Sequence, residues 1–247
     1  MEIVGCVALV TGAGRGLGKA YVDALLELGA RKVYCGMRHP STQQNSSAVS
    51  IQLDVTDPSD IAAAAATCRD VTLVINNAGI MTNSNTLDQS ASENLRLEME
   101  VNVYGLLAMT QAFAPVLANN GGGALINVLS LVAVLASPFT ATYSATKHAA
   151  HALTDCARKQ LRGQGTLVSG VYCGFMETEM VSSVTAAKTQ PAVIARRTLE
   201  EIRVGNECIL ADRRTEIAWR DLFLNRSAVH ERVQRAWDEA HGAPVRS

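Results

Sequence analysis

The chain has 247 residues, of which 48% are hydrophobic and 18% charged, and its formal net charge is −1. This composition excludes a disordered protein, and the near-zero net charge gives no bulk attraction for nucleic acid. No stretch reaches the roughly 20 apolar residues needed to cross a bilayer, and the sequence opens without a signal-peptide pattern. We therefore expect a single cytoplasmic domain over residues 1–247, with neither a nucleic-acid nor a membrane partner.

Short apolar runs alternate with helix-length segments along the chain. Strands are predicted at residues 3–11, 32–37, 49–53, 71–76, 124–129, 167–172 and 207–210. Helices are predicted at residues 16–28, 57–68, 92–119, 143–161 and 191–203. The strands are rich in Val, Ile and Leu without clean alternation, which is typical of strands that are covered on both faces. The pattern predicts an α/β fold with a doubly wound parallel sheet, a Rossmann fold, with helices on both faces.

Three segments depart from this regular pattern. The connection at 38–48 is too short for the usual crossover helix, so we expect a loop or a single turn there. Residues 176–190 are predicted to form a substrate flap. Residues 213–247 are predicted to form a C-terminal helical extension, with one or two helices over 215–240 and a break near 225–227.

A glycine-rich turn joins the first strand to the first helix. Gly12, Gly16 and Gly18 allow backbone N–H groups to approach a pyrophosphate at a helix N-terminus. An NAD enzyme would carry an acidic residue at the end of the second strand, but Arg38 closely follows that position and Arg15 lies inside the turn. A guanidinium can bind a 2′-phosphate through paired N–H groups, so we expect NADP(H) rather than NAD(H).

Tyr143 and Lys147 stand one helical turn apart, with Ser130 upstream. A phenol titrates near 10, and moving its pKa to about 7 requires roughly 4 kcal/mol of differential stabilisation. A lysine ammonium at position i+4 can supply much of it. Beside a dinucleotide site, such a phenol predicts a carbonyl–alcohol oxidoreductase.

Together, six elements of the chain resemble the short-chain dehydrogenase/reductase family in order and spacing over about residues 3–180. They are residues 11–18 (TGAGRGLG), 54–57 (DVTD), 76–79 (NNAG), Asn102, Ser130 and 143–147 (YSATK).

The resemblance implies a role for each matching residue. Tyr143 would be the general acid in reduction and the base in oxidation, and Ser130 would hydrogen-bond the substrate carbonyl. Lys147 would bind the nicotinamide ribose and lower the pKa of Tyr143. Asn102 would interrupt its helix to hold a water linked to Lys147. Cofactor contacts are implied for Gly12, Arg15, Gly16, Leu17, Gly18, Arg38, Asp54, Val55, Asn77, Ala78, Gly79, Tyr143, Lys147, Gly174, Met176 and Thr178.

The residues expected around the substrate are mostly apolar, and no cation is obviously placed among them to bind an acid. This indicates a neutral apolar ketone, aldehyde or secondary alcohol. The expected wall residues are Leu131, Val132, Leu135, Phe139, Cys173, Phe175, Met176 and Met180. His148 and His151 lack acidic or cysteine partners at suitable spacing, so no metal is expected.

The assembly of the protein and the alternative functions are the remaining questions that the sequence addresses. We expect a homo-oligomer, a dimer through the helices around 100–118 and 143–161, whereas the C-terminal segment differs from the one that packs in the family's tetramers. Three other functions stay open. They are a non-catalytic NADP-binding sensor or scaffold, a cofactor-free lyase such as a halohydrin dehalogenase, and an epimerase or dehydratase with bound NAD.

Overall fold

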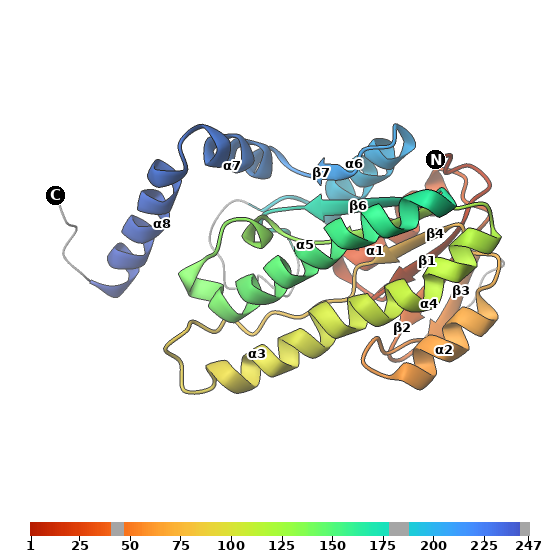
Figure 1. Cartoon of the computed structure of the whole chain (residues 1–247), viewed down its shortest axis with the longest axis horizontal. Helices are drawn as coiled ribbons and strands as arrows, with labels where there is room; N and C mark the ends of the chain where they lie inside the picture. Colours follow the sequence, from red (N-terminus) through yellow and green to blue (C-terminus); the bar gives the residue numbers. More distant parts are fainter. Residues whose placement is uncertain (41–46, 178–187, 243–247) are drawn as a thin grey trace.

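The computed structural model describes residues 1–40, 47–177 and 188–242, and its centre is a seven-stranded parallel sheet (Figure 1). The strand order is β3-β2-β1-β4-β5-β6-β7, with every neighbouring pair parallel. This confirms the predicted doubly wound sheet. The strands are β1 (Val7–Thr11), β2 (Lys32–Met37), β3 (Ala48–Gln52), β4 (Leu73–Asn76), β5 (Ala124–Val128), β6 (Leu167–Tyr172) and β7 (Cys208–Leu210).

Helices cover both faces of the sheet (Figure 1). Helices α1 (Gly16–Glu27) and α6 (Pro191–Arg203) pack together on one face, with the core that contains Tyr21 and Ile194. On the other face lie α2 (Pro58–Thr67), α3 (Ala91–Met99), α4 (Leu106–Asn119) and α5 (Ala141–Leu161), around a core that contains Met109 and Phe113. Strands β1, β4 and β5 are completely buried between these layers, which explains why their sequences are mostly apolar without an alternating pattern.

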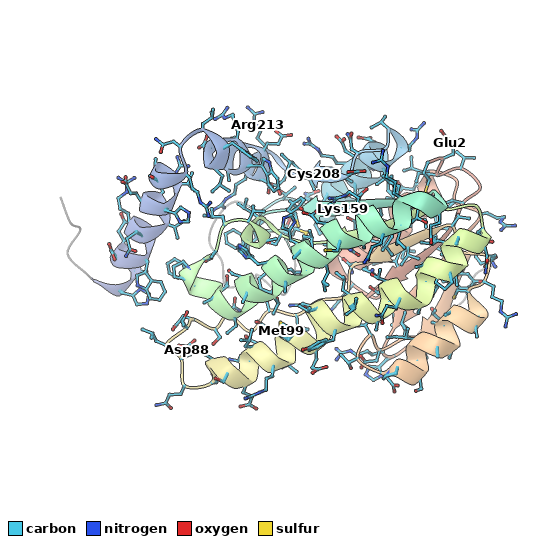
Figure 2. The ribbon with its side chains drawn as sticks, viewed as in Figure 1. Glu2, Asp88, Met99, Lys159, Cys208 and Arg213 are labelled. Carbon is cyan, nitrogen blue, oxygen red and sulfur yellow. The ribbon has the colours of Figure 1, made fainter. Side chains whose placement is uncertain are left out.

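The helix predicted at 92–119 is not uniform. A π-helical turn, Glu100–Gly105, separates α3 from α4. At its end, a Cβ added to Gly105 would lie 2.9 Å from the carbonyl oxygen of Val55. The missing side chain therefore lets the turn approach the segment after β3. Met99, labelled in Figure 2, marks the end of α3.

By length and composition, the continuous helix Ala91–Asn119 could cross a membrane, so the prediction that no segment qualifies is wrong on this criterion. Its most apolar window has a mean hydropathy of 1.4, and 39% of that window is buried. Such a helix is weak evidence for a membrane span because the core helix of a globular domain has the same composition. Here α4 packs on α2, α5 and the sheet.

The C-terminal segment forms two helices, α7 (Arg213–Leu224) and α8 (Arg226–His241). They are broken at Asn225, as predicted, and the side chain of Asn225 accepts a hydrogen bond from the Ala228 amide. Helix α8 lies at the end of the molecule beyond α7 (Figure 1). Most of the short connection between β2 and β3, and the interior of the predicted flap, lie outside the described residues. The ends of that flap are joined by a bridge between Met176 and Thr189. Three short 3-10 turns complete the described structure: Leu131–Ala133, Pro138–Thr140 and Arg162–Gln164.

Candidate active site

The predicted site residues gather at the carboxyl edge of the sheet. The glycine turn follows β1, Asn77 follows β4, Ser130 follows β5 and Gly174 comes shortly after β6. In an open parallel sheet the ligand crevice lies at this edge, where the strand order reverses between β1 and β4. Residues from distant parts of the sequence therefore meet around one crevice.

The glycine turn is held too closely for side chains. Gly12 and Gly16 have φ angles of 65° and 54°, which favour glycine. A Cβ on Gly18 would lie 2.1 Å from the carbonyl oxygen of Gly12 and 2.7 Å from Nδ2 of Asn77. Helix α1 begins at this point without a side-chain cap, and its first turn carries no acidic residue. A tight, exposed and uncapped helix start of this kind fits the pyrophosphate of a dinucleotide.

Thr11, which sequence reasoning did not single out, joins the two cofactor loops. Its hydroxyl accepts hydrogen bonds from the backbone amides of Asn77 (3.0 Å) and Ala78 (2.9 Å). In return, Nδ2 of Asn77 donates to the carbonyl oxygen of Thr11 at 2.9 Å. The loop predicted to form the cofactor floor, through Gly79, is thereby fixed against the glycine turn.

The end of β2 lies against the same turn. Sδ of Met37 would be 3.0 Å from a Cβ on Gly14, and the amide of Ala13 donates to the carbonyl oxygen of Gly36 at 3.1 Å. Arg15 and Arg38, on either side of this junction, are both exposed. At the end of β2, where an NAD enzyme would carry an acidic residue for the ribose, this chain has the thioether of Met37. Arg38 follows Met37 in the sequence, and Arg15 follows Gly14 in the glycine turn.

Asp54 and Val55 follow β3. The carboxylate of Asp54 accepts from the amide and hydroxyl of Thr56 at 2.9 and 2.7 Å, and its own amide donates to Asp60. Val55 is buried against Gly105. These contacts give Asp54 a fixed orientation at the sheet edge.

Helix α5 presents Tyr143 and Lys147 toward the end of β5. Nζ of Lys147 lies 5.5 Å from the centroid of the Tyr143 ring and donates to the carbonyl oxygen of Val128 at 2.9 Å. Oγ of Ser130 donates to the carbonyl oxygen of Cys173 at 3.4 Å and accepts from the Val132 amide at 3.3 Å. The structure therefore places the serine, tyrosine and lysine around the end of one strand.

The pKa of Tyr143 is raised rather than lowered, so the Lys147 ammonium does not outweigh burial here, and its expected effect on the phenol stays a prediction. Burial is the main cause, and electrostatic interactions with Cys173 and Glu98 act in the same direction. Burial also lowers the pKa of Lys147 to about 8 and raises the pKa of the Cys173 thiol to about 12. Helix spacing alone does not reveal this burial: Lys147 is only 4% exposed, and its Nζ is directed at a carbonyl group.

Asn102 lies in the π-helical turn, as the resemblance implied. Its Oδ1 accepts from the Ile80 amide at 2.9 Å, and its Nδ2 donates to the Ile80 carbonyl oxygen and to Oγ1 of Thr146. A cavity of about 10 Å³ adjoins it, lined also by Lys147 and Asn76. Among the described residues, Oδ1 of buried Asn76 has no hydrogen-bond partner. The size and polar lining of the cavity suit one water molecule, and the predicted water role of Asn102 stays a prediction.

The loop after β6 meets the start of α7. The amide of Gly174 donates to Oδ2 of Asp212 at 2.7 Å, and the guanidinium of Arg214 lies 5.0 Å from the centroid of the Phe175 ring. The expectation that no cation stands near the substrate wall therefore needs correction, because the sequence separation concealed Arg214. Leu17 is buried and Met176 half-buried, whereas Thr178 and Met180 lie outside the described residues.

No cluster of metal-binding side chains occurs within residues 1–40, 47–177 and 188–242. His148 instead contacts the Ser144 carbonyl oxygen, and Nδ1 of His151 lies 2.7 Å from Oη of Tyr172. Both histidines thus have structural partners.

A family model described as short chain dehydrogenase matches residues 6–189. Over 211 residues the chain is 29% identical to the mouse protein named dehydrogenase/reductase SDR family member 7B, with 78% of this chain and 65% of that protein covered. It is 31% identical over 193 residues to 3-oxoacyl-[acyl-carrier-protein] reductase FabG of Vibrio cholerae, with 74% and 79% covered. The chain spans 65% to 68% of the length of the first curated relatives it matches.

Among solved structures, a short chain dehydrogenase from Burkholderia cenocepacia in complex with NADP is similar over almost the whole chain. The two are 39% identical, with 94% of this chain and 99% of that one covered and a TM-score of 0.91.

Proposed function

Since the chain belongs to the short chain dehydrogenase family, a family of oxidoreductases, we propose that it interconverts a carbonyl compound and a secondary alcohol with NADP(H). The observation that carries the proposal is the position of Tyr143 and Lys147. They lie 5.5 Å apart, from ring centroid to Nζ, at the sheet edge that also carries Ser130 and the glycine turn.

Several residues would hold the cofactor. The backbone N–H groups of Gly16 to Gly18 would bind the pyrophosphate, Asp54 and Val55 would adjoin the adenine, and Lys147 would bind the ribose next to the nicotinamide. The nicotinamide supplies or accepts the hydride when bound. Arg15 and Arg38 would bind the 2′-phosphate of NADP(H).

The chain's own residues would handle the proton. The phenol of Tyr143 is neutral at physiological pH, and its raised pKa keeps it in the form that donates a proton from Oη to a carbonyl oxygen. Oγ of Ser130 would donate a hydrogen bond to the same oxygen and so orient the carbonyl. Lys147, with a pKa of about 8, is still mostly an ammonium at pH 7, and its positive charge would favour the phenolate left after donation.

The remaining wall of the site supports a neutral apolar substrate. Ala133 and Cys173 are buried, whereas Leu131, Val132 and Phe139 keep part of their apolar surface accessible beside Ser130. Such a surface favours ketones and secondary alcohols with an apolar body over small polar ones.

The test combines cofactor binding with turnover. NADPH and NADH would be titrated by fluorescence, and a ketone panel would then be followed at the nicotinamide absorbance. We expect Tyr143→Phe to bind NADPH normally and to lose turnover by at least about a hundredfold. Tyr104→Phe, at an exposed tyrosine, should keep full activity. Binding without turnover in the unaltered protein would favour the non-catalytic sensor instead.

The cofactor preference has its own test. Arg38→Ala should weaken NADPH binding about tenfold and leave NADH binding unchanged, because only NADPH carries the 2′-phosphate. Equal weakening of both cofactors would refute the assigned role of Arg38.

We also infer that the protein is a dimer. The helix Ala91–Asn119 is apolar, yet only 39% of its most apolar window is buried, and Leu97 and Tyr104 are each 53% exposed. A second copy packed on α3 to α5 would cover this surface. Sedimentation equilibrium should give twice the chain mass, and Tyr104→Glu should reduce that mass to one chain.

A further inference from the structure

The C-terminal helices contact both loops that frame the catalytic residues. One loop runs from Ser130 to Tyr143, and the other follows β6 from Cys173 to Glu177. Helix α7 meets the second loop at its first turn, marked by Arg213 in Figure 2, and α8 meets the first loop near its own end. The two helices thus reach the site from the part of the chain where the sequence predicts only an extension.

The contact of α7 is fixed by a buried carboxylate. Asp212 is 5% exposed, and its Oδ2 accepts from the Gly174 amide at 2.7 Å while its Oδ1 accepts from the Thr215 amide at 2.9 Å. Further along α7, Trp219 packs edge-on against Tyr172, with 4.7 Å between the ring centroids. Helix α7 is therefore anchored at two points, which sets the direction from which α8 departs.

The contact of α8 is aromatic. The Trp237 ring lies 5.1 Å from the Phe139 ring, and His241 stacks on Trp237 with 3.8 Å between centroids. Phe139 belongs to the Pro138–Thr140 turn that immediately precedes α5 and Tyr143. Despite this packing, Phe139 keeps 40% of its surface exposed. The pair therefore keeps apolar surface accessible at the turn that leads into α5, four residues before Tyr143.

We propose that α8 is a wall of the substrate site, where Trp237 and Phe139 contact the apolar part of the substrate beyond its carbonyl carbon. The proposal rests on the proposed function and makes its substrate class more specific. The preferred substrates are ketones or secondary alcohols with an aryl group or a medium-length alkyl chain. Short ketones reach Ser130 and Tyr143 but not Phe139 and Trp237, so they are expected to be poor substrates.

The first test is a chain-length series of 2-ketones from butanone to 2-octanone. Trp237→Ala should raise KM for 2-octanone by about tenfold, change its kcat less than about twofold, and leave KM for butanone unchanged, because only the longer ketone reaches the ring. Arg235→Ala, at an exposed position on the same helix, is the matched control and should change neither KM. An equal effect on both ketones, or none on either, would overturn the proposal, provided that thermal unfolding shows Trp237→Ala to be folded.

The second test reports binding without turnover. The chain has two tryptophans, so Trp219→Phe leaves Trp237 as the only indole. With saturating NADP⁺, 4-phenyl-2-butanone should quench the Trp237 emission saturably, and Phe139→Ala in the same background should weaken that binding. Quenching in a protein that reduces no ketone would support the wall and refute the reductase. Turnover without quenching or any chain-length effect would refute the wall alone, and absence of both would refute both.

Discussion

Gly18→Ala tests whether the glycine turn is as tight as the structure indicates. The added Cβ would lie 2.1 Å from the carbonyl oxygen of Gly12, against a normal C···O contact of about 3.3 Å. The neighbouring atom is backbone and cannot rotate away, so the turn must open by roughly 1 Å. Overpacking of this kind costs about 1–3 kcal/mol, and the helix propensity of alanine returns about 1 kcal/mol at most.

We therefore expect Gly18→Ala to lower the free energy of unfolding by about 1–2 kcal/mol and to weaken NADPH binding at least about tenfold. Urea unfolding and NADPH fluorescence titration measure the two effects. Gly163→Ala is the matched control, because no atom lies within 4 Å of a Cβ there and its stability should be unchanged or slightly higher. If both variants behave alike in stability and binding, the steric argument is refuted.

Three further predictions concern Thr11, Lys147 and Asp212. Thr11→Val removes the acceptor of the Ala78 amide and one of two acceptors of the Asn77 amide, which keeps the carbonyl oxygen of Ile75. It should lower the free energy of unfolding in urea by about 2 kcal/mol and weaken NADPH binding; a loss below about 0.5 kcal/mol would contradict it. The Lys147 pKa falls to about 8 on folding, so the unfolded chain binds more protons between pH 8 and about 10.4. Without cofactor, the stability of the unaltered protein relative to Lys147→Met should therefore rise across this window, by up to about 1.4 kcal/mol per pH unit, and stay level below pH 8; a constant difference would disprove the assigned shift. Asp212→Ala should lower the free energy of unfolding by about 2 kcal/mol and change the fluorescence emission of Trp219, because α7 loses its anchor on Gly174. Unchanged emission would show that α7 docks without the Asp212 carboxylate.

The sheet was predictable because its strands follow a simple rule. Strands β1 and β5 are wholly buried, so most of their residues are apolar and do not alternate with polar ones, and the helix-length segments between the strands leave few parallel arrangements. The glycine turn could also be predicted, because the positive φ of Gly12 and the close approach of Gly18 to the Gly12 carbonyl oxygen both require glycine. The roles assigned to Tyr143 and Lys147 came from the resemblance and stay predictions until the variants are measured.

The parts that could not be predicted depend on contacts between distant segments. Thr11 bonds to residues 66 and 67 positions later, and Asp212 to one 38 positions earlier, so neither pairing leaves a local pattern. The direction of the Tyr143 pKa shift was predicted wrongly because helix spacing alone does not reveal burial. An ammonium at i+4 lowers a phenol's pKa in water, but burial disfavours both charged forms.

The π-helical turn Glu100–Gly105 has a consequence for the length of its helix. Each residue of an α-helix turns the chain by about 100°, so an extra residue within the wide turn offsets the faces before and after it by about that angle. Before the turn, the Glu98 carboxylate accepts from the amide and hydroxyl of Thr82 at 2.6 and 2.7 Å; after it, Met109 is buried against the sheet. Deleting Val101 would restore a regular helix and rotate one of these faces away from its partner. The π-helical turn therefore sets the rotation between the face of α3 that carries Glu98 and the face of α4 that packs on the sheet, so the number of residues in the turn is fixed by two contacts outside it.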